Sequence, residues 1–191
     1  MPSFDFTGKN ILNGSLVPES GNLPAYKIET TKIGKHARGV TTLSGTPAAS
    51  ISWPERSFTI GGETLPLDNI ECKVWVDGKL KSARIWQWEK TEYELHFWNG
   101  EWTVKDCSSS SSPDVVVAQF RSATSHVLHK NTPARLTLSC DVQPAELAFL
   151  LLALIYSEFR RADIAAPHFF GTGPPVGMFA FIPFAAAGSS C

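Results

Sequence analysis

The stretch Leu147–Tyr156, LAFLLLALIY, is an unbroken apolar run inside a segment with the composition of a good helix, Pro144–Asp163. A helix on a protein surface has an apolar stripe along one side, whereas a helix that is apolar on every side must be enclosed on every side. The run is too short to cross a bilayer, which takes roughly 20 such residues. We therefore expect a helix that the rest of the protein encloses.

The chain before this helix consists of short β-type runs separated by turn residues, which is typical of an antiparallel sheet or barrel. The clearest signal is YELHFW-NG-EWTVKD at 93–106, because Asn99 and Gly100 both tolerate positive φ and so predict a tight hairpin. Further strands are expected at 25–31, 39–43, 50–53, 57–60, 72–76, 114–120, 125–129 and 134–140. The predicted fold class is mainly β: an antiparallel β-barrel of about 10–12 strands enclosing one apolar α-helix, Pro144–Asp163.

Length and composition favour one domain with a substantial core. The chain has 191 residues, of which 43% are hydrophobic and 18% charged, as in an ordinary globular protein. We expect residues 1–163 to form a single β-barrel domain with its central helix. Residues 164–191 are apolar and rich in proline, so they cannot form a continuous helix and are expected to pack on the barrel as a C-terminal strap.

Charge and cysteine content restrict the partners and the compartment. The 17 basic and 18 acidic residues nearly cancel, which argues against nucleic acid as a partner. The first residues contain no basic region followed by an apolar stretch, so no secretory signal is expected. The cysteines form no C-x-x-C pair, and we expect reduced thiols in a cytoplasmic protein, at Cys72, Cys107, Cys140 and Cys191.

The order of these segments resembles the tubby C-terminal-like architecture of tubby proteins, phospholipid scramblases and LURP-one-related proteins. More narrowly, it is similar to a family of small basidiomycete fungal proteins in that group. The resemblance covers roughly residues 20–163, and its motifs are YKIET near residue 26, FTIGGETL at 58–65, RIWQWEKTEYELHFW at 84–98, VVVAQF at 115–120 and LAFLLLALIYSEFRR at 147–161. It implies a barrel around a central helix, and a role in binding lipid or phosphoinositide head groups, or a pigment as in mushroom chromoproteins.

Aromatic residues supply the strongest candidate for a ligand site. The chain contains 6 tryptophans, and large flat side chains commonly line pockets for planar apolar ligands. The alternative is that they form the core and rim of the barrel. The predicted ligand-binding residues are Trp86, Trp88, His96, Trp98 and Trp102.

The leading hypothesis is therefore a non-enzymatic binding protein for an apolar or planar small molecule, such as a fungal pigment or a lipid held without a covalent bond. Because the helix fills the barrel, this ligand would lie between the barrel wall, the aromatic hairpin and the C-terminal strap. One alternative is a peripheral membrane module that binds phosphoinositides or other anionic lipids through a basic cluster, Lys27, Lys32, Lys35 and Arg38. That cluster could equally be a solvated loop, with Glu29 partly neutralising it.

Evidence for catalysis is sparse, and we expect no catalytic residues. No G-x-S-x-G elbow is present, and the serine run at 108–112 is typical of a linker. His126 and His129 are weak candidates for metal ligands, because a spacing of three on a strand places the rings on opposite faces. A metal-dependent enzyme remains an alternative. So does a structural protein that forms oligomers by exchanging its strap.

Overall fold

The computed structural model describes residues 2–19, 25–33, 37–76, 79–108, 115–123, 132–139 and 142–165. Within these ranges thirteen strands form one antiparallel sheet, in the order β7-β6-β5-β4-β3-β2-β1-β13-β12-β11-β10-β9-β8. The strands are β1 (Ser3–Asn10), β2 (Asn13–Pro18), β3 (Tyr26–Ile33), β4 (Ala37–Ser44), β5 (Ala49–Ser52), β6 (Ser57–Ile60), β7 (Glu63–Pro66), β8 (Glu71–Val76), β9 (Lys79–Trp88), β10 (Thr91–Trp98), β11 (Glu101–Asp106), β12 (Val115–Arg121) and β13 (Arg135–Leu138).

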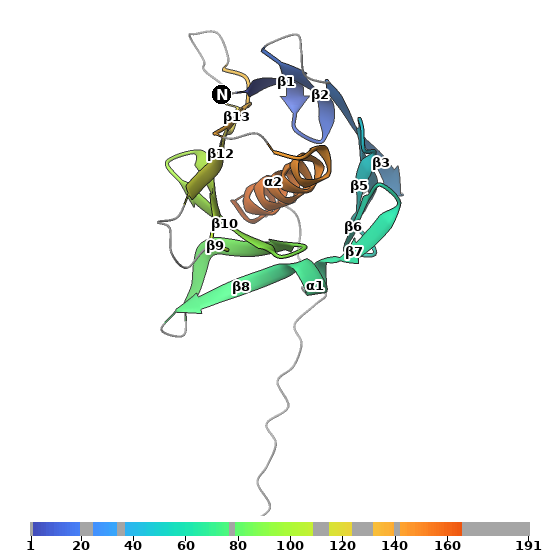
Figure 1. Cartoon of the computed structure of the whole chain (residues 1–191). Helices are drawn as coiled ribbons and strands as arrows, with labels where there is room; N and C mark the ends of the chain where they lie inside the picture. Colours follow the sequence, from blue (N-terminus) through green and yellow to red (C-terminus); the bar gives the residue numbers. More distant parts are fainter. Residues whose placement is uncertain are drawn as a thin grey trace, which may run out of the picture.

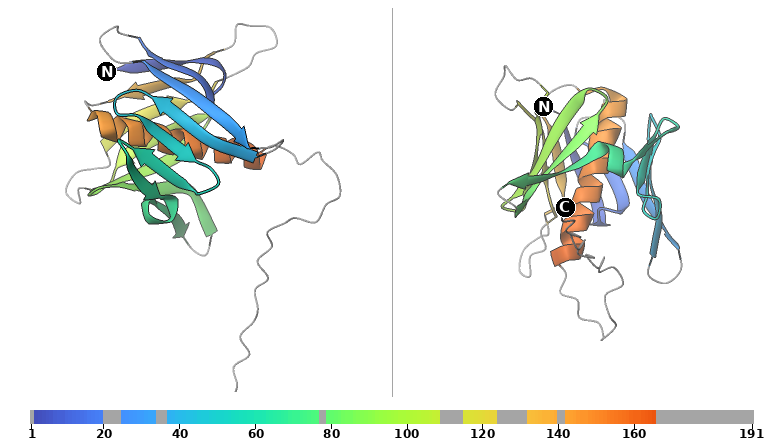
Figure 2. Two further views of the ribbon diagram at one scale, coloured as in Figure 1. Left: turned by 90° about the vertical axis from the view of Figure 1, so that its right-hand side faces the viewer. Right: turned by 90° about the horizontal axis from the view of Figure 1, so that it is seen from below.

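The sheet curves around a long helix, α2 (Pro144–Ala165), so that strands lie on every side of it (Figure 1). Figure 2 shows the same helix lengthwise, with strands in front of it and behind it. Among the described residues no pairing joins the edge strands β7 and β8, so the sheet is open there. A short helix, α1 (Leu67–Ile70), connects these two strands. A mainly β fold with one C-terminal helix is thus confirmed, as thirteen strands of an open sheet.

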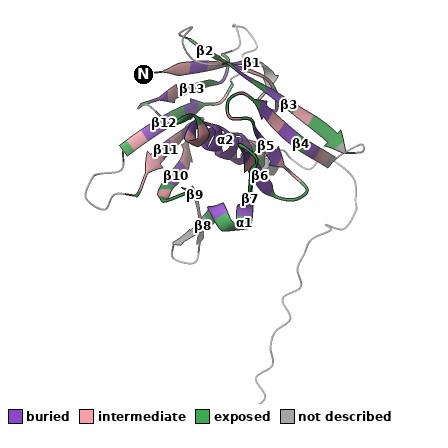
Figure 3. Ribbon diagram, turned by 45° about the vertical axis from the view of Figure 1, so that its right-hand side comes forward, coloured by how far each residue is buried: buried purple, intermediate pink, exposed green. Residues whose placement is uncertain are grey.

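Burial of α2 agrees with its composition. Every residue from Leu147 to Glu158 is buried, and the middle turns are purple all round in Figure 3. A surface helix would expose one side, so the expectation of an enclosed helix is confirmed. The helix ends at Ala165, two residues after its predicted end at Asp163.

Two glycine-containing turns set the register of neighbouring strands. Asn99 and Gly100 have φ values of 50° and 82°, and they pair Trp98 with Glu101 at the end of the predicted β10–β11 hairpin. Gly61 and Gly62, at φ 58° and 92°, join β6 to β7 in the same way. Positive φ at both central residues gives the twist that two-residue hairpins require.

The N-terminal hairpin of β1 and β2 was not predicted from the sequence. Phe4 and Phe6 alternate along β1 and are buried in the core, and β1 pairs with β13, which is distant in the chain. The strand expected at 125–129 lies outside the described residues. So does the predicted strap 164–191, except for residues 164 and 165, which belong to α2. Neither described helix combines the length and hydropathy that a membrane span requires.

Candidate functional site

Three of the predicted ligand-binding tryptophans face the central helix. Trp86 is 0% exposed and stacks on Phe58, with ring centroids 5.4 Å apart and an interplanar angle of 7°. Trp88 packs on Phe149 of α2 with centroids 5.0 Å apart. Trp102 is also buried. These side chains lie within the packed contact between sheet and helix.

The other two predicted residues lie on the opposite face of the sheet. Side chains alternate along β10, so His96 and Trp98 point away from the side that carries Tyr93, Leu95 and Phe97. Trp98 is 69% exposed beside the hairpin turn. The structure therefore does not bring the five predicted ligand-binding residues together in one pocket.

The predicted basic cluster is also divided. Lys27 lies opposite Ser44 and forms an ion pair with Glu29 at 2.7 Å. Lys32 lies opposite Arg38, toward the other end of the same two strands. Lys35 lies outside the described residues. Of the four, Arg38 is the residue that lines a cavity.

This cavity, which we call the helix-end cavity, lies beside the last two turns of α2 and has a volume of about 350 Å³. Its wall is mixed, and the apolar residues that line it are Phe6, Ile11, Leu12, Ala123, Ala134, Phe159 and Ala162. Its polar side chains are Arg38, Ser122, Glu158 and Arg161.

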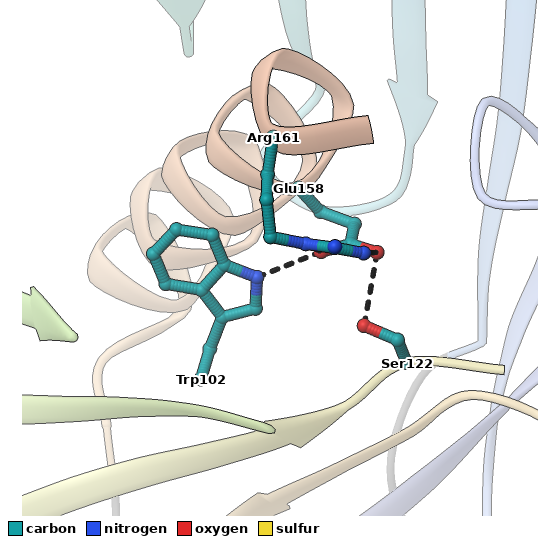
Figure 4. Close-up of polar contacts among 4 residues, drawn as sticks. All are labelled: Trp102, Ser122, Glu158 and Arg161. Carbon is teal, nitrogen blue, oxygen red and sulfur yellow. Dashed lines mark hydrogen bonds and ion pairs between the residues drawn. The ribbon is translucent and has the colours of Figure 1, made fainter. Parts of the chain in front are cut away.

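Glu158 accepts four hydrogen bonds at the helix-end cavity (Figure 4). It is 8% exposed and accepts hydrogen bonds from Trp102 Nε1 at 2.8 Å and from Ser122 Oγ at 2.9 Å. Arg161 donates two further bonds, from Nε at 2.9 Å and from Nη2 at 2.8 Å. The two oxygens of one carboxylate thus connect α2 to β11 and to the end of β12.

The hydrogen bonds decide the charge of Glu158. Burial alone would raise its pKa, but the bonds from Arg161, Trp102 and Ser122 outweigh burial and hold the pKa below its usual value. The carboxylate in turn raises the pKa of Arg161. At neutral pH the two side chains form an ion pair whose charges cancel.

The Arg38 side chain packs on an aromatic ring, whereas Arg161 pairs with a carboxylate. The guanidinium carbon of Arg38 lies 3.7 Å from the centre of the Phe159 ring, a cation–π contact. Within the described part of the chain, no carboxylate pairs with Arg38 and no oxygen accepts a hydrogen bond from its guanidinium. Among the side chains of the cavity wall that the structure describes, Arg38 therefore carries the uncompensated charge.

Replacing Glu158 with glutamine is expected to lower the free energy of unfolding by about 1.5–3 kcal/mol at pH 7, because the Arg161 guanidinium loses its charged acceptor. The folded-state pKa of Glu158 is depressed, so its stabilising effect is present above the unfolded-state pKa and is lost as the pH falls through the folded-state value. The difference between wild type and variant should therefore shrink in acid.

Urea denaturation from pH 7 down to pH 3 measures this difference. Glu92→Gln, which removes an exposed carboxylate, serves as the matched control. If Glu158→Gln behaves like Glu92→Gln at every pH, the Glu158 network has no stabilising effect.

Sequence reasoning missed Glu158 as a site residue, although the polar SEFRR segment directly after the apolar run was a visible signal. In the described ranges no three His, Cys, Asp or Glu side chains gather closely enough to hold a metal ion, and His126 and His129 lie outside them. Comparisons with protein-family models, with curated proteins and with solved structures found no match to this chain.

Proposed function

We propose that this chain is a non-enzymatic binding protein for a small molecule with an apolar or planar body, and that the helix-end cavity is its binding site. The observation that carries the proposal is the make-up of the cavity wall. Sites for small molecules are concave, hold roughly 300–1,000 Å³ and combine a mostly apolar wall with a few placed polar groups. The helix-end cavity reaches this size, with a volume of about 350 Å³, and it combines apolar residues with four polar side chains.

We further propose that the sheet is a barrel of the tubby C-terminal-like kind, with a pigment or a lipid as the ligand. The buried side chains of Leu147–Glu158 support a barrel-like enclosure, as does the position of α1 across the open edge. Because α2 occupies the centre, the ligand lies elsewhere, and the helix-end cavity offers space beside one end of the helix.

Blocking the cavity should abolish binding. N-phenyl-1-naphthylamine, a neutral aryl probe whose fluorescence rises in apolar surroundings, is expected to bind the full chain. Ala162 is an exposed residue on the cavity wall, so a bulky indole in Ala162→Trp should fill the cavity without disturbing the core and weaken binding at least about tenfold.

Arg160→Trp is the matched control, because Arg160 is exposed on the same helix and is not part of the cavity wall. Fluorescence titration of the three proteins measures the dissociation constants. Equal binding by the wild type and Ala162→Trp would place the probe elsewhere and overturn the proposal, and so would failure of the wild type to bind.

A second candidate function is binding to an anionic membrane surface. It is favoured by Trp98, which is 69% exposed at the tip of the β10–β11 hairpin. Exposed tryptophan is typical of protein segments that lie at the membrane interface. Sedimentation with vesicles containing phosphatidylserine should then fall with added salt and with Trp98→Ala.

A further inference from the structure

We infer that the ligand of the helix-end cavity carries a single acidic group, such as a carboxylate or sulfonate, and that Arg38 binds this group. The inference rests on the proposed function, since it assigns a charge to the ligand of the same cavity. It depends on three observations: the charge balance of the cavity, the contacts of Arg38 and the position of the apolar wall.

The charge balance leaves one positive charge. Glu158 and Arg161 form two parallel hydrogen bonds at 2.8 and 2.9 Å, the arrangement in which a guanidinium and a carboxylate satisfy each other. Trp102 and Ser122 supply further donors to Glu158, which fixes the carboxylate on Arg161. Among the described side chains of the cavity wall, Arg38 is then the one whose charge has no counterpart.

The contact of Arg38 with Phe159 leaves the hydrogen-bonding capacity of its guanidinium unused. The five N–H donors of arginine match the oxygens of a carboxylate or similar acid, and a ring contact consumes none of them. At 3.7 Å the ring also holds the guanidinium beside the cavity, which reduces the entropy lost on binding. Arg38 is thus a pre-positioned donor for an anion.

The remaining wall defines the rest of the ligand. Phe6, Ile11 and Leu12 contribute apolar surface to the same cavity as Arg38. Burial of an apolar body against this surface is favourable, at about 25 cal/mol per Å² removed from water. The ligand is therefore an amphiphile, with an apolar part in the cavity and its acid on Arg38.

The number of charges favours a monoanion. A phosphate monoester carries a charge of about −1.5 to −2 at neutral pH, which a single uncompensated guanidinium does not neutralise. Arg161 adds no net positive charge for a second negative charge, because Glu158 already balances its charge. A carboxylate or sulfonate carries one negative charge, which the single positive charge of Arg38 neutralises.

Two probes with the same aryl body test the inference. N-phenyl-1-naphthylamine is neutral, and 1-anilinonaphthalene-8-sulfonate adds one sulfonate. The wild type should bind the sulfonate at least about tenfold more tightly than the neutral probe. Arg38→Met should lose this preference and bind the two probes within about twofold of each other, since methionine can still pack on Phe159 but carries no charge.

Arg160→Met removes an equal charge from an exposed position outside the cavity wall, so it should keep the preference. Dodecanoate should likewise displace the neutral probe better than dodecan-1-ol from the wild type and not from Arg38→Met. If the neutral probe binds in the cavity and the sulfonate has no advantage, or if Arg38→Met keeps the advantage, the inference is wrong and the proposed function stands. If neither probe binds the wild type, both are wrong.

Discussion

Truncating either Leu150 or Leu152 to alanine is expected to lower the free energy of unfolding by about 2–5 kcal/mol. The two positions are two residues apart, so their side chains point to nearly opposite sides of α2, at about 100° of rotation per residue. They are 1% and 0% exposed respectively. Each truncation leaves a cavity on its own side of the helix, because strands of the sheet pack against both sides.

Urea denaturation monitored by circular dichroism measures the free energy of unfolding of both variants. Arg160→Ala, at an exposed position of the same helix, should change the free energy of unfolding by no more than about 0.5 kcal/mol. If one leucine variant were as mild as this control, α2 would have a free side, and the enclosure of the helix would be disproved.

The second large loss of stability is expected on truncation of Trp86. Its ring stacks on Phe58 and meets Tyr156 and Phe149 edge-on, with centroids 5.7 and 6.4 Å away. Removing a buried aromatic side chain of this size in Trp86→Ala should cost about 3–5 kcal/mol. The indole lies within the sheet–helix contact, so the loss should appear as instability rather than as a specific loss of binding.

Trp98→Ala is the comparison for Trp86→Ala, since both remove an indole from adjacent strands. Trp98 is 69% exposed, so the variant should stay within about 0.5 kcal/mol of the wild type. Denaturation followed by tryptophan fluorescence measures both. A cost at Trp98 equal to that at Trp86 would show that the outer face of β10 is covered.

Local sequence signals predicted many of the elements but not their order in the sheet. The apolar run Leu147–Tyr156 indicated the helix and its burial because ten consecutive apolar residues leave no polar side. Asn99-Gly100 indicated its hairpin because the turn geometry requires those residue types. The pairing of β1 with β13 depends on contacts between residues distant in the chain, for which no local pattern exists.

The five predicted ligand-binding residues are divided between two faces of the sheet, for a reason that the hairpin itself contains. A two-residue turn at Asn99-Gly100 places Trp98 opposite Glu101 and Phe97 opposite Trp102, so Trp98 and Trp102 must lie on different faces of the sheet. A count of tryptophans takes no account of this register, and it therefore groups residues of the inner face with residues of the outer face of the sheet. Arg38 was found for its charge, but its contact with Phe159 joins residues distant in the chain and could not be read from spacing.

The location of the ligand is tested most directly by titrating ¹⁵N-labelled protein with N-phenyl-1-naphthylamine and following backbone amide shifts. We expect the largest shifts at residues of the helix-end cavity, such as Leu12, Ala123, Phe159 and Ala162. Shifts centred on Glu146 at the other end of α2, or on His96 and Trp98 on the outer face of β10, would contradict the account.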